Sequence, residues 1–390
     1  MPLTEYFYLL WSADYGRMEH NKYRVRFQTD DERILLFLGK MDAMKAAVLE
    51  EYRKMVWKEV PTPEITGDEV LMKVKYACIC GSDQHIFRGE FHPRTRLPLI
   101  QGHEFSAEIV ETGPEVKKLR KGDRVAVDPI IWCGKCPACE RHHYPACTSL
   151  KLMGVDLDGG FAEYAKAPEP MLFRVSPGIS DKQAALVEVL SIGFHACNRA
   201  SVGPDDSLVI WGAGKVGQCI LQAARTKTKN TLIMVDILDA RLGMAEKAYP
   251  GIHVINAAQE DPVEKIRDIT GGRGVDIAFE AVGHFKEIPG KVNPVRGCIQ
   301  SIRGAGKVCV LGLSDEPTPV LFKELIWKEA SLVASRVTQG EFAETIENLQ
   351  KGTLKPDALI SDVLSADKAQ EAFERLEAEP EKHLKILLKF

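Results

Sequence analysis

The sequence predicts an α/β protein with a β-rich first part and a doubly wound parallel sheet later in the chain. Two observations support this prediction. Short apolar runs bounded by turn residues fill the stretch from Met44 to Val127, as half-buried strands do. Strand-like and helix-like patterns then alternate over about residues 201–335, which is typical of βα units in a parallel sheet. A chain of 390 residues is long enough for two such domains.

Composition and net charge are those of an ordinary soluble globular chain. Apolar residues make up 45% of the sequence and charged residues 27%. Because the formal net charge is −4, no electrostatic argument favours a nucleic acid or an anionic membrane as a partner. No apolar run reaches the roughly 18 residues that a membrane-spanning helix needs. Four of the ten cysteines crowd into Cys133–Cys147, which suits a metal in a reducing cytoplasm better than a secreted disulfide scaffold.

Residues 1–43 form an N-terminal extension of unknown role. Its two apolar patches, Phe7–Trp11 and Ile34–Leu38, are separated by charged sequence, and neither has the basic flank and cleavage site of a signal peptide. We interpret the extension as an upstream translation product, with the real start at Met41 or Met44. An accessory arm used in oligomer contacts is the alternative.

Four stretches after this extension are predicted as strands of the β-rich part. They combine apolar runs or a partial alternation of apolar and polar residues with turns at Gly113-Pro114 and Lys121–Asp123. The predicted strands are Lys45–Leu49, Glu69–Tyr76, Ser106–Val110 and Arg124–Val127.

A thiol, an imidazole and carboxylates fall within the short span from Cys80 to Glu104. These groups are zinc-ligand types, and a cytosolic chain uses such a cluster for a metal more often than for disulfides. Three protein ligands with one open position are the pattern of a catalytic zinc. We predict Cys80 and His103 as two ligands, and either Glu104 or Glu188 as the third.

Glu188 belongs to a predicted helix. Ser180 with Gln183 three residues later is a capping-box signature, and a largely apolar helical pattern follows from Ala184 to Phe194. The surface is the usual place for a glutamate. If Glu188 is instead buried among these apolar neighbours, it needs a cation, and zinc would supply one.

Four cysteines form the most selective motif of the sequence, with the spacing C-x2-C-x2-C-x7-C. Four thiolates satisfy tetrahedral zinc and leave no open position, so the predicted zinc is structural. Oxidised pairs are the alternative, but cysteines three residues apart rarely suit disulfide geometry. A nucleic-acid-binding zinc ribbon would need a longer spacer between its cysteine pairs. The predicted ligands are Cys133, Cys136, Cys139 and Cys147.

A G-x-G-x-x-G fingerprint follows the apolar run Leu208–Trp211 and precedes a helical pattern, which is the context that a dinucleotide-binding turn requires. The first two glycines allow a tight turn and close approach to a pyrophosphate, and the third lets helix and strand pack closely. The phosphates then meet free N–H groups at the helix N-terminus. The predicted cofactor-binding residues are Gly212, Gly214, Lys215, Val216 and Gly217.

An acidic residue ends the next predicted strand, Thr231–Val235. Asp236 has the offset of an acid that accepts hydrogen bonds from the adenosine ribose. Because a carboxylate there repels a 2′-phosphate, the sequence favours NAD over NADP. Arg241 is a further cofactor-binding candidate, with a solvated helix residue as the alternative reading.

The remaining sequence continues the alternation of strands and helices. His284–Arg303 contains two prolines and is predicted as a loop-rich segment that lies over the cofactor or at a subunit contact. The other predicted elements are strands at Val275–Phe279, Val308–Gly312 and Leu384–Leu388, and helices at Phe342–Leu349 and Ala366–Leu376.

Three motifs stand in one order along the chain: Cys80 with His103-Glu104, the four cysteines, and the glycine fingerprint with Asp236. Together they resemble the zinc-dependent medium-chain alcohol dehydrogenase family, in its sorbitol (polyol) and threonine dehydrogenase branch. The resemblance covers the chain from about residue 44 to its end.

This resemblance implies a fold, domain boundaries and cofactors. A GroES-like, β-rich catalytic domain would comprise residues 44–195 and 336–390, and an inserted Rossmann domain that binds NAD would comprise residues 196–335. The implied cofactors are two zinc ions per chain and NAD. The implied assembly is a cytoplasmic homodimer or homotetramer, with a small-molecule alcohol as its substrate.

The resemblance also implies a reaction, in which hydride passes between a secondary alcohol (a polyol, a sugar alcohol or a threonine-like compound) and NAD. The proton would leave through the Ser82 hydroxyl, the cofactor ribose and then His85. Asp83 would orient His103 through its other ring nitrogen. Arg336 falls where polyol dehydrogenases place an arginine that faces the substrate.

The chain departs from the family pattern at three positions. Val189 stands where the family usually has proline after the acid, and Ser335 and Val337 replace the aromatic neighbours of Arg336, which weakens a specific polyol assignment. The alternatives are a simple alcohol dehydrogenase that uses NADP and a metal-free NADPH-dependent quinone or enoyl reductase on the same fold. The set of candidate zinc ligands argues against the metal-free enzyme.

Overall fold

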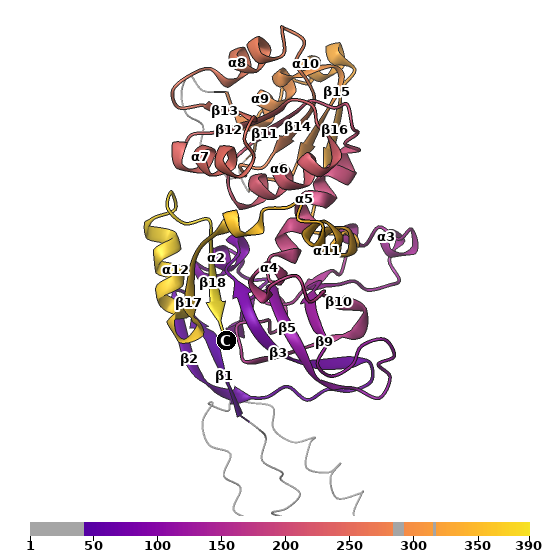
Figure 1. Cartoon of the computed structure of the whole chain (residues 1–390), viewed down its shortest axis with the longest axis vertical. Helices are drawn as coiled ribbons and strands as arrows, with labels where there is room; N and C mark the ends of the chain where they lie inside the picture. The colour runs from indigo at the N-terminus through magenta and orange to yellow at the C-terminus, as the bar shows by residue number, and fades with distance from the viewer. Residues whose placement is uncertain (1–42, 284–291, 315–316) are drawn as a thin grey trace, which may run out of the picture. The chain divides into compact units, whose positions relative to one another are not determined.

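The structure, a computed structural model, describes residues 43–283, 292–314 and 317–390 (Figure 1). Residues 1–42 of the predicted extension and residues 284–291 of the predicted loop-rich segment lie outside it. Within the described ranges, no helix combines the length and the apolar character needed to cross a bilayer.

The β-rich part is built on a seven-stranded sheet with the order β10-β6-β5-β3-β18-β17, in which β9 also pairs with β3. The last strand of the chain, β18, runs antiparallel to β3, so the C-terminal segment returns to the first part of the protein. The strands are β3 (Glu69–Cys78), β5 (Glu104–Thr112), β6 (Arg124–Val127), β9 (Tyr164–Pro168), β10 (Leu172–Arg174), β17 (Ile360–Ser365) and β18 (Lys385–Lys389).

Two smaller sheets complete this part. One has the order β2-β1-β4, with β1 (Ala43–Glu51), β2 (Lys54–Pro61) and β4 (Leu99–Ile100). Strand β2 was not predicted, because it is an edge strand whose exposed charged residues interrupt the apolar pattern. The other is the antiparallel pair β7 (Ile130–Ile131) and β8 (Lys151–Leu152), which closes the base of the segment that contains the four cysteines.

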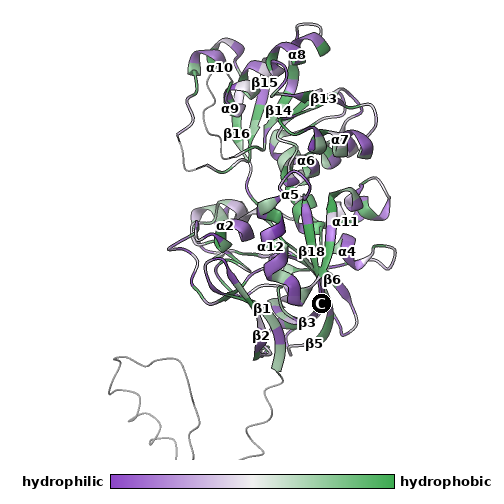
Figure 2. Cartoon of the chain, turned by 90° about the vertical axis from the view of Figure 1, so that its left-hand side faces the viewer, coloured by the Kyte–Doolittle hydropathy of each residue, from purple (hydrophilic) through white to green (hydrophobic). Residues whose placement is uncertain are grey.

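The second large sheet has six parallel strands in the order β13-β12-β11-β14-β15-β16. Successive residues of its central strands face two separate cores: Ile210 and Met234 on one side, Val209 and Ile233 on the other. Burial on both faces explains the continuous apolar runs that predicted these strands (Figure 2). The strands are β11 (Leu208–Trp211), β12 (Leu232–Asp236), β13 (His253–Asn256), β14 (Val275–Glu280), β15 (Ile302–Val310) and β16 (Ser331–Ala334).

The predicted α/β fold with a doubly wound parallel sheet is therefore confirmed. The strand order of the second sheet reverses between β11 and β14, and ligands of such sheets bind outside the carboxyl ends of the strands at this point. The helices are α2 (Gly81–Phe87), α3 (Pro137–Glu140), α4 (Asp181–Ala184), α5 (Val187–Ala200), α6 (Lys215–Lys227), α7 (Asp239–Ala248), α8 (Pro262–Ile269), α9 (Pro294–Ser301), α10 (Phe322–Lys328), α11 (Phe342–Gln350) and α12 (Ala369–Ala378).

The helical stretch predicted after Ser180 is two helices rather than one. The capping box forms, since Ser180 Oγ accepts from the Gln183 N–H at 3.3 Å and Gln183 Oε1 accepts from the Ser180 N–H at 3.1 Å. However, α4 ends at Ala184 and α5 begins at Val187. The break places Glu188 in the first turn of a new helix, where the helix dipole favours a carboxylate. Helix α5 also runs across the predicted domain boundary between residues 195 and 196.

The prediction that His284–Arg303 is loop-rich is wrong for its second half. Asn293 caps α9 by accepting from the Arg296 N–H at 2.8 Å, and Pro294 occupies the first helical position, where its missing N–H costs nothing. Cys298 and Ile299 then bury the helix against the parallel sheet. Proline here starts a helix, whereas the prediction treated it as a breaker.

Candidate active site and metal centres

Helix α2 brings Cys80 to the centre of the β-rich part. Cys80 is the N-cap residue of this helix, and its backbone N–H donates to Asp83 Oδ2 at 2.8 Å. Asp83 is fully buried, and its other carboxylate oxygen, Oδ1, lies 3.5 Å from His103 Nδ1. One carboxylate therefore fixes the start of the helix and also faces the imidazole, which is the position that its predicted orienting role requires.

His103 and Glu104 reach the same point from the start of β5. The Sγ atom of Cys80, a ring nitrogen of His103 and a carboxylate oxygen of Glu104 all lie within 4.8 Å of one another. His103 is 3% exposed and Glu104 is fully buried. A partly buried thiol, a buried imidazole and a buried carboxylate at this spacing are donor types that zinc takes in proteins, so the residues fit the predicted metal.

The surroundings of His103 are negative. Burial by itself lowers the pKa of the imidazole, but the charges of Asp83 and Cys80 outweigh burial and raise this pKa well above its usual value. On the other side of the ring, Ser82 Oγ lies 3.2 Å from His103 Nε2. Asp83 and Cys80 therefore surround the ring with negative charge, which a bound cation would also balance.

Glu104 already has one cation beside it. Lys385, on the final strand β18, is fully buried and donates to both carboxylate oxygens of Glu104. Burial lowers the pKa of Lys385, but Glu104 and then Cys80 outweigh it and raise this pKa. Lys385 was not predicted as a site residue. A lone lysine within the apolar run Leu384–Leu388 is the signal that could have found it.

Glu188 is buried beside this cluster. The apolar residues around it in the sequence had suggested that it could be buried. The side chain is 4% exposed, and its Oε2 atom has no hydrogen-bond partner among the described residues. Burial, with a further contribution from Glu104, raises the pKa of Glu188 to about 8 against the opposing effects of His103 and Lys385. The group of ligand atoms within 4.8 Å does not include Glu188. A buried carboxylate without a partner takes up a proton unless a cation is present.

The two residues predicted for proton transfer lie on one helix but differ in surroundings. Ser82 contacts the ring of His103, as described above. His85 is partly exposed, and its Nδ1 atom contacts the Glu90 carboxylate and lies 3.0 Å from Arg88 Nη2. Helix α2 therefore places one residue at the buried cluster and the other, three residues later, toward charged side chains and solvent.

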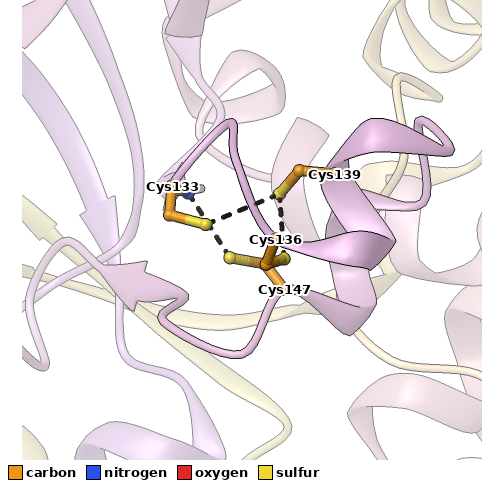
Figure 3. A group of neighbouring side chains, drawn as sticks. All are labelled: Cys133, Cys136, Cys139 and Cys147. Carbon is orange, nitrogen blue, oxygen red and sulfur yellow. Dashed lines mark hydrogen bonds between the residues drawn. The ribbon is translucent and has the colours of Figure 1, made fainter.

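The four cysteines gather in one lobe between β7 and β8 (Figure 3). Their sulfur atoms all lie within 4.8 Å of one another. Cys139 Sγ is 3.5 Å from Cys136 Sγ and 4.0 Å from Cys133 Sγ. All ten cysteines of the sequence fall in the described ranges, and none of them is in a disulfide there.

Backbone N–H groups favour thiolates in this lobe. Those of Cys139 and Thr148 lower the pKa of Cys136 to about 5. The N–H of Cys133 donates to Cys147 Sγ at 3.3 Å and lowers the pKa of that thiol. Burial raises the pKa of Cys139 to about 12. Because the thiolate is the metal-binding form, the lobe fits a tetrahedral zinc with four sulfur ligands.

Two side chains of the segment after β16 donate hydrogen bonds to the lobe that contains the four cysteines. Arg336 Nη1 donates to the Pro145 carbonyl at 3.1 Å, and Gln339 Nε2 donates to the His142 carbonyl at 2.9 Å. Arg336, predicted to face the substrate, is therefore anchored at the cysteine lobe by one of its five N–H groups.

The glycine fingerprint forms a tight turn from β11 into α6. Gly212 has φ +102°, which only glycine adopts without strain. A Cβ atom at Gly217 would lie 1.7 Å from the Gly212 carbonyl oxygen, so the helix packs against the turn only without a side chain there. Gly214 is the N-cap residue of α6, and Lys215 and Val216 follow in its first turn.

Asp236 and Arg241 lie beside this turn. Asp236 ends β12, and its Oδ2 atom accepts from the Ala213 N–H at 2.6 Å. Its Oδ1 atom accepts from the Ile237 and Leu238 N–H groups at 2.8 and 3.0 Å. Arg241 Nη1 lies 3.8 Å from the position that a Cβ atom of Gly214 would take, and Arg241 Nη2 donates to the Pro380 carbonyl at 3.1 Å.

Family models match two long segments of the chain. Residues 66–177 match the alcohol dehydrogenase GroES-like domain, and residues 216–351 match the zinc-binding dehydrogenase domain. The first segment contains the Cys80 cluster and the cysteine lobe, and the second begins within the glycine fingerprint.

Three known proteins illustrate the similarity. The sorbitol dehydrogenase of Bacillus subtilis is 33% identical over 340 residues, which cover 85% of this chain and 93% of that enzyme. The L-threonine 3-dehydrogenase of Pyrococcus furiosus is 35% identical over 329 residues, or 82% of this chain and 91% of that enzyme. A crystal structure of the Escherichia coli alcohol dehydrogenase rspB in complex with NADH has a TM-score of 0.81 and 30% identity, with 89% and 99% of the two chains covered.

Three observations indicate the same family: the order of the two matched domains, the donor groups at the two cysteine-containing clusters, and the similar known proteins. The chain belongs to the zinc-type medium-chain alcohol dehydrogenase family, and it is an oxidoreductase that acts on CH–OH groups.

Proposed function

We propose that the chain transfers a hydride between a secondary alcohol and NAD at a zinc centre held by Cys80, His103 and Glu104. The cluster of these three side chains carries the proposal, because its ligand atoms lie within 4.8 Å of one another in a fold that belongs to zinc-type dehydrogenases. Zinc supplies Lewis acidity that lowers the pKa of an alcohol, and the nicotinamide supplies the hydride acceptor.

The choice of Glu104 rather than Glu188 as the third direct ligand rests on distance. Glu104 belongs to the group of mutually close ligand atoms, whereas Glu188 does not. Glu188 contributes the buried oxygen without a partner, so its carboxylate is the one whose charge the metal would balance. In this arrangement Lys385 orients the carboxylate of Glu104, and Asp83 orients the ring of His103.

Residues of α2 would move the proton. The Ser82 hydroxyl, which contacts His103, is placed to take the proton of the substrate hydroxyl. The proton would then pass by way of the cofactor ribose to His85, which lies on the same helix with its side chain 27% exposed, and from there to solvent.

The cofactor would lie along the carboxyl end of the parallel sheet. The N–H groups of Lys215, Val216 and Gly217 at the start of α6 are donors for a pyrophosphate. Asp236 would accept from the adenosine ribose and repel a 2′-phosphate, which favours NAD. Arg241, beside Gly214, is the residue that could instead accommodate the extra phosphate of NADP.

The substrate class we propose is a polyol, a sugar alcohol or a threonine-like compound. Two of the similar enzymes are a sorbitol dehydrogenase and a threonine dehydrogenase. We keep Arg336 as a residue that could face the substrate, because four of its N–H groups are not used by the bond to Pro145.

A second zinc ion would be held by the four cysteines of the lobe and would have a structural role. Four sulfur ligands leave no position for a substrate. These thiols stay reduced in a reducing compartment, which supports the cytoplasm as the location of the protein.

Two copies of the chain would associate through β16 and α10. Strand β16 is the edge of the parallel sheet, and its exposed backbone can pair with another strand. Large apolar side chains of α10 and β16 are exposed to solvent: Phe322 is 68%, Ile326 73%, Trp327 78% and Leu332 46% exposed. A solvent-exposed apolar patch beside an unpaired edge is typical of an oligomer interface, and we propose a homodimer or a homotetramer built on it.

The zinc-replete protein should reduce NAD with at least one member of a panel of polyols, sugar alcohols, threonine and simple secondary alcohols. A chelator should abolish the reaction. Cys80→Ser should lower kcat by about a hundredfold or more, because a metal ligand is lost, while the unfolding temperature changes little.

The matched control is Cys309→Ser, at a buried cysteine of the parallel sheet whose Sγ lies 3.9 Å from the Ala196 carbonyl oxygen, away from both proposed zinc sites. It should keep activity. Normal turnover of Cys80→Ser would show that the zinc assignment is wrong, and chelator-insensitive reduction of a quinone or an enoyl compound by NADPH would favour the metal-free reductase.

Asp236→Ala should raise the ratio of kcat/KM with NADP to kcat/KM with NAD by roughly tenfold or more, because a charge that repels the 2′-phosphate is removed. Asp236→Asn is the matched variant, since it removes the charge and keeps an acceptor for the Ala213 N–H. Both variants should shift the ratio in the same direction. An unchanged ratio in both would exclude Asp236 as the residue that selects NAD.

Trp327→Glu should lower the oligomeric state measured by light scattering after size-exclusion chromatography, because a charge would enter the apolar interface. Leu157→Glu, at an exposed apolar residue of the β-rich part (41% exposed), should leave the mass unchanged. If Trp327→Glu has the mass of the wild type, the interface lies elsewhere.

A further inference from the structure

Lys215 occupies a position where a lysine is electrostatically unfavourable. It is the first residue of α6, directly after the N-cap residue Gly214. The N-terminus of a helix carries a partial positive charge, which favours acidic side chains and disfavours a lysine. A function that depends on the ammonium group would account for a lysine at this point of the fingerprint.

The side chain of Lys215 extends from the parallel-sheet part of the protein to residues of the β-rich part. Its Nζ atom donates to Gln84 Oε1 at 3.1 Å and, at the long limit of a hydrogen bond, to the Ile79 carbonyl at 3.5 Å. Gln84 lies in α2, and Ile79 directly precedes Cys80, the N-cap residue of that helix. The ammonium group therefore ties the dinucleotide-binding turn to the helix that presents the proposed zinc ligand.

The two acceptors of Lys215 are both uncharged, so within the described part of the chain the ammonium has no counter-ion in direct contact. Burial, and then the charge of Lys385, lower the pKa of Lys215 to about 8, against the opposing effects of Cys80, Glu104 and Asp83. Lys385 already has Glu104 as its partner. The fingerprint turn, the helix N-terminus and Lys215 thus form a positively charged region that favours an anionic ligand.

An ammonium group has three N–H donors, and two of them are used here. The third is available for a ligand at the start of α6, where the pyrophosphate of a dinucleotide would meet the free N–H groups of the helix. A pyrophosphate would supply the missing negative charge without displacing either protein acceptor.

We propose that Lys215 binds the pyrophosphate of the cofactor while it holds Gln84 and the Ile79 carbonyl, so that cofactor binding fixes α2 against the fingerprint turn. Lys215 is then a cofactor-binding residue and also a positioning residue, because it acts on Cys80 and Ser82 through α2. This inference rests on the proposed function, in that it takes the dinucleotide as the cofactor.

The first test measures the affinity of the zinc-replete full-length protein for NADH and for ADP-ribose, which keeps the pyrophosphate and lacks the nicotinamide. Lys215→Met should weaken the binding of both compounds by a similar factor, roughly ten- to a hundredfold, because a hydrogen bond to a charged group is lost. Added salt should weaken NADH binding less in Lys215→Met than in the wild type, since one fewer charge contact is screened. Lys229→Met, at an exposed lysine just beyond the other end of α6, is the matched control and should bind as the wild type does.

The second test measures the coupling to α2. Saturating NADH should slow backbone hydrogen exchange in residues 81–87 of the wild type, and it should do so much less in Lys215→Met. Gln84→Leu should weaken NADH binding less than Lys215→Met does, and the double variant should bind no worse than Lys215→Met alone, because the two changes break one connection.

The outcomes separate this inference from the proposed function. A wild-type protein that binds neither NADH nor NADPH would overturn the proposed cofactor itself. If the wild type binds NADH and Lys215→Met binds it equally well, Lys215 does not contact the pyrophosphate, and the inference is wrong. Weaker binding by Lys215→Met with an unchanged exchange pattern in residues 81–87 would overturn the positioning role.

Discussion

The buried ion pair between Glu104 and Lys385 is the contact on which the arrangement of the active site depends. It joins residues that lie 281 positions apart in the sequence. A buried charge that loses its partner is strongly destabilising, so the pair requires that the last strand of the chain be in register with β3. In that register Leu387 lies opposite Cys78, and the Ile79 N–H donates to the Ile386 carbonyl at 3.1 Å. The end of the chain therefore sets the backbone that leads directly into Cys80.

Two unbalanced groups of charges meet at this point. In the acidic group, Asp83 and Cys80 raise the pKa of His103, and the Oε2 atom of Glu188 has no hydrogen-bond partner among the described residues. In the basic group, at the start of α6, the ammonium of Lys215 contacts only the uncharged acceptors of Gln84 and Ile79 among the described residues. A metal ion would balance the first and a dinucleotide the second. The two proposed cofactors thus complete the electrostatics of adjoining parts of one site.

Features with short-range spacing were predictable from the sequence. The four cysteines and the glycine fingerprint each occupy fewer than twenty residues, and local geometry alone brings their functional groups together. Contacts between side chains that lie far apart in the sequence were not predictable. Lys385 meets Glu104 only through the register of β18 on β3, and Lys215 meets Gln84 only where the two parts of the chain touch. Strand β2 and helix α9 were missed for a different reason. In β2, exposed charged residues interrupt the apolar pattern that predicts a strand. In α9, Pro294 starts the helix, whereas the prediction treated proline as a helix breaker.

Anomalous diffraction at the zinc absorption edge, from crystals of the full-length protein grown with zinc, tests the central claim most directly. We expect two zinc peaks per chain. One should lie among the sulfur atoms of the four cysteines, and the other about 2.3 Å from Cys80 Sγ and about 2.0–2.2 Å from a His103 nitrogen and a Glu104 carboxylate oxygen. A peak in the cysteine lobe alone, with none beside Cys80 and His103, would contradict the account, because the buried acidic cluster would then be a structural feature and not a metal centre.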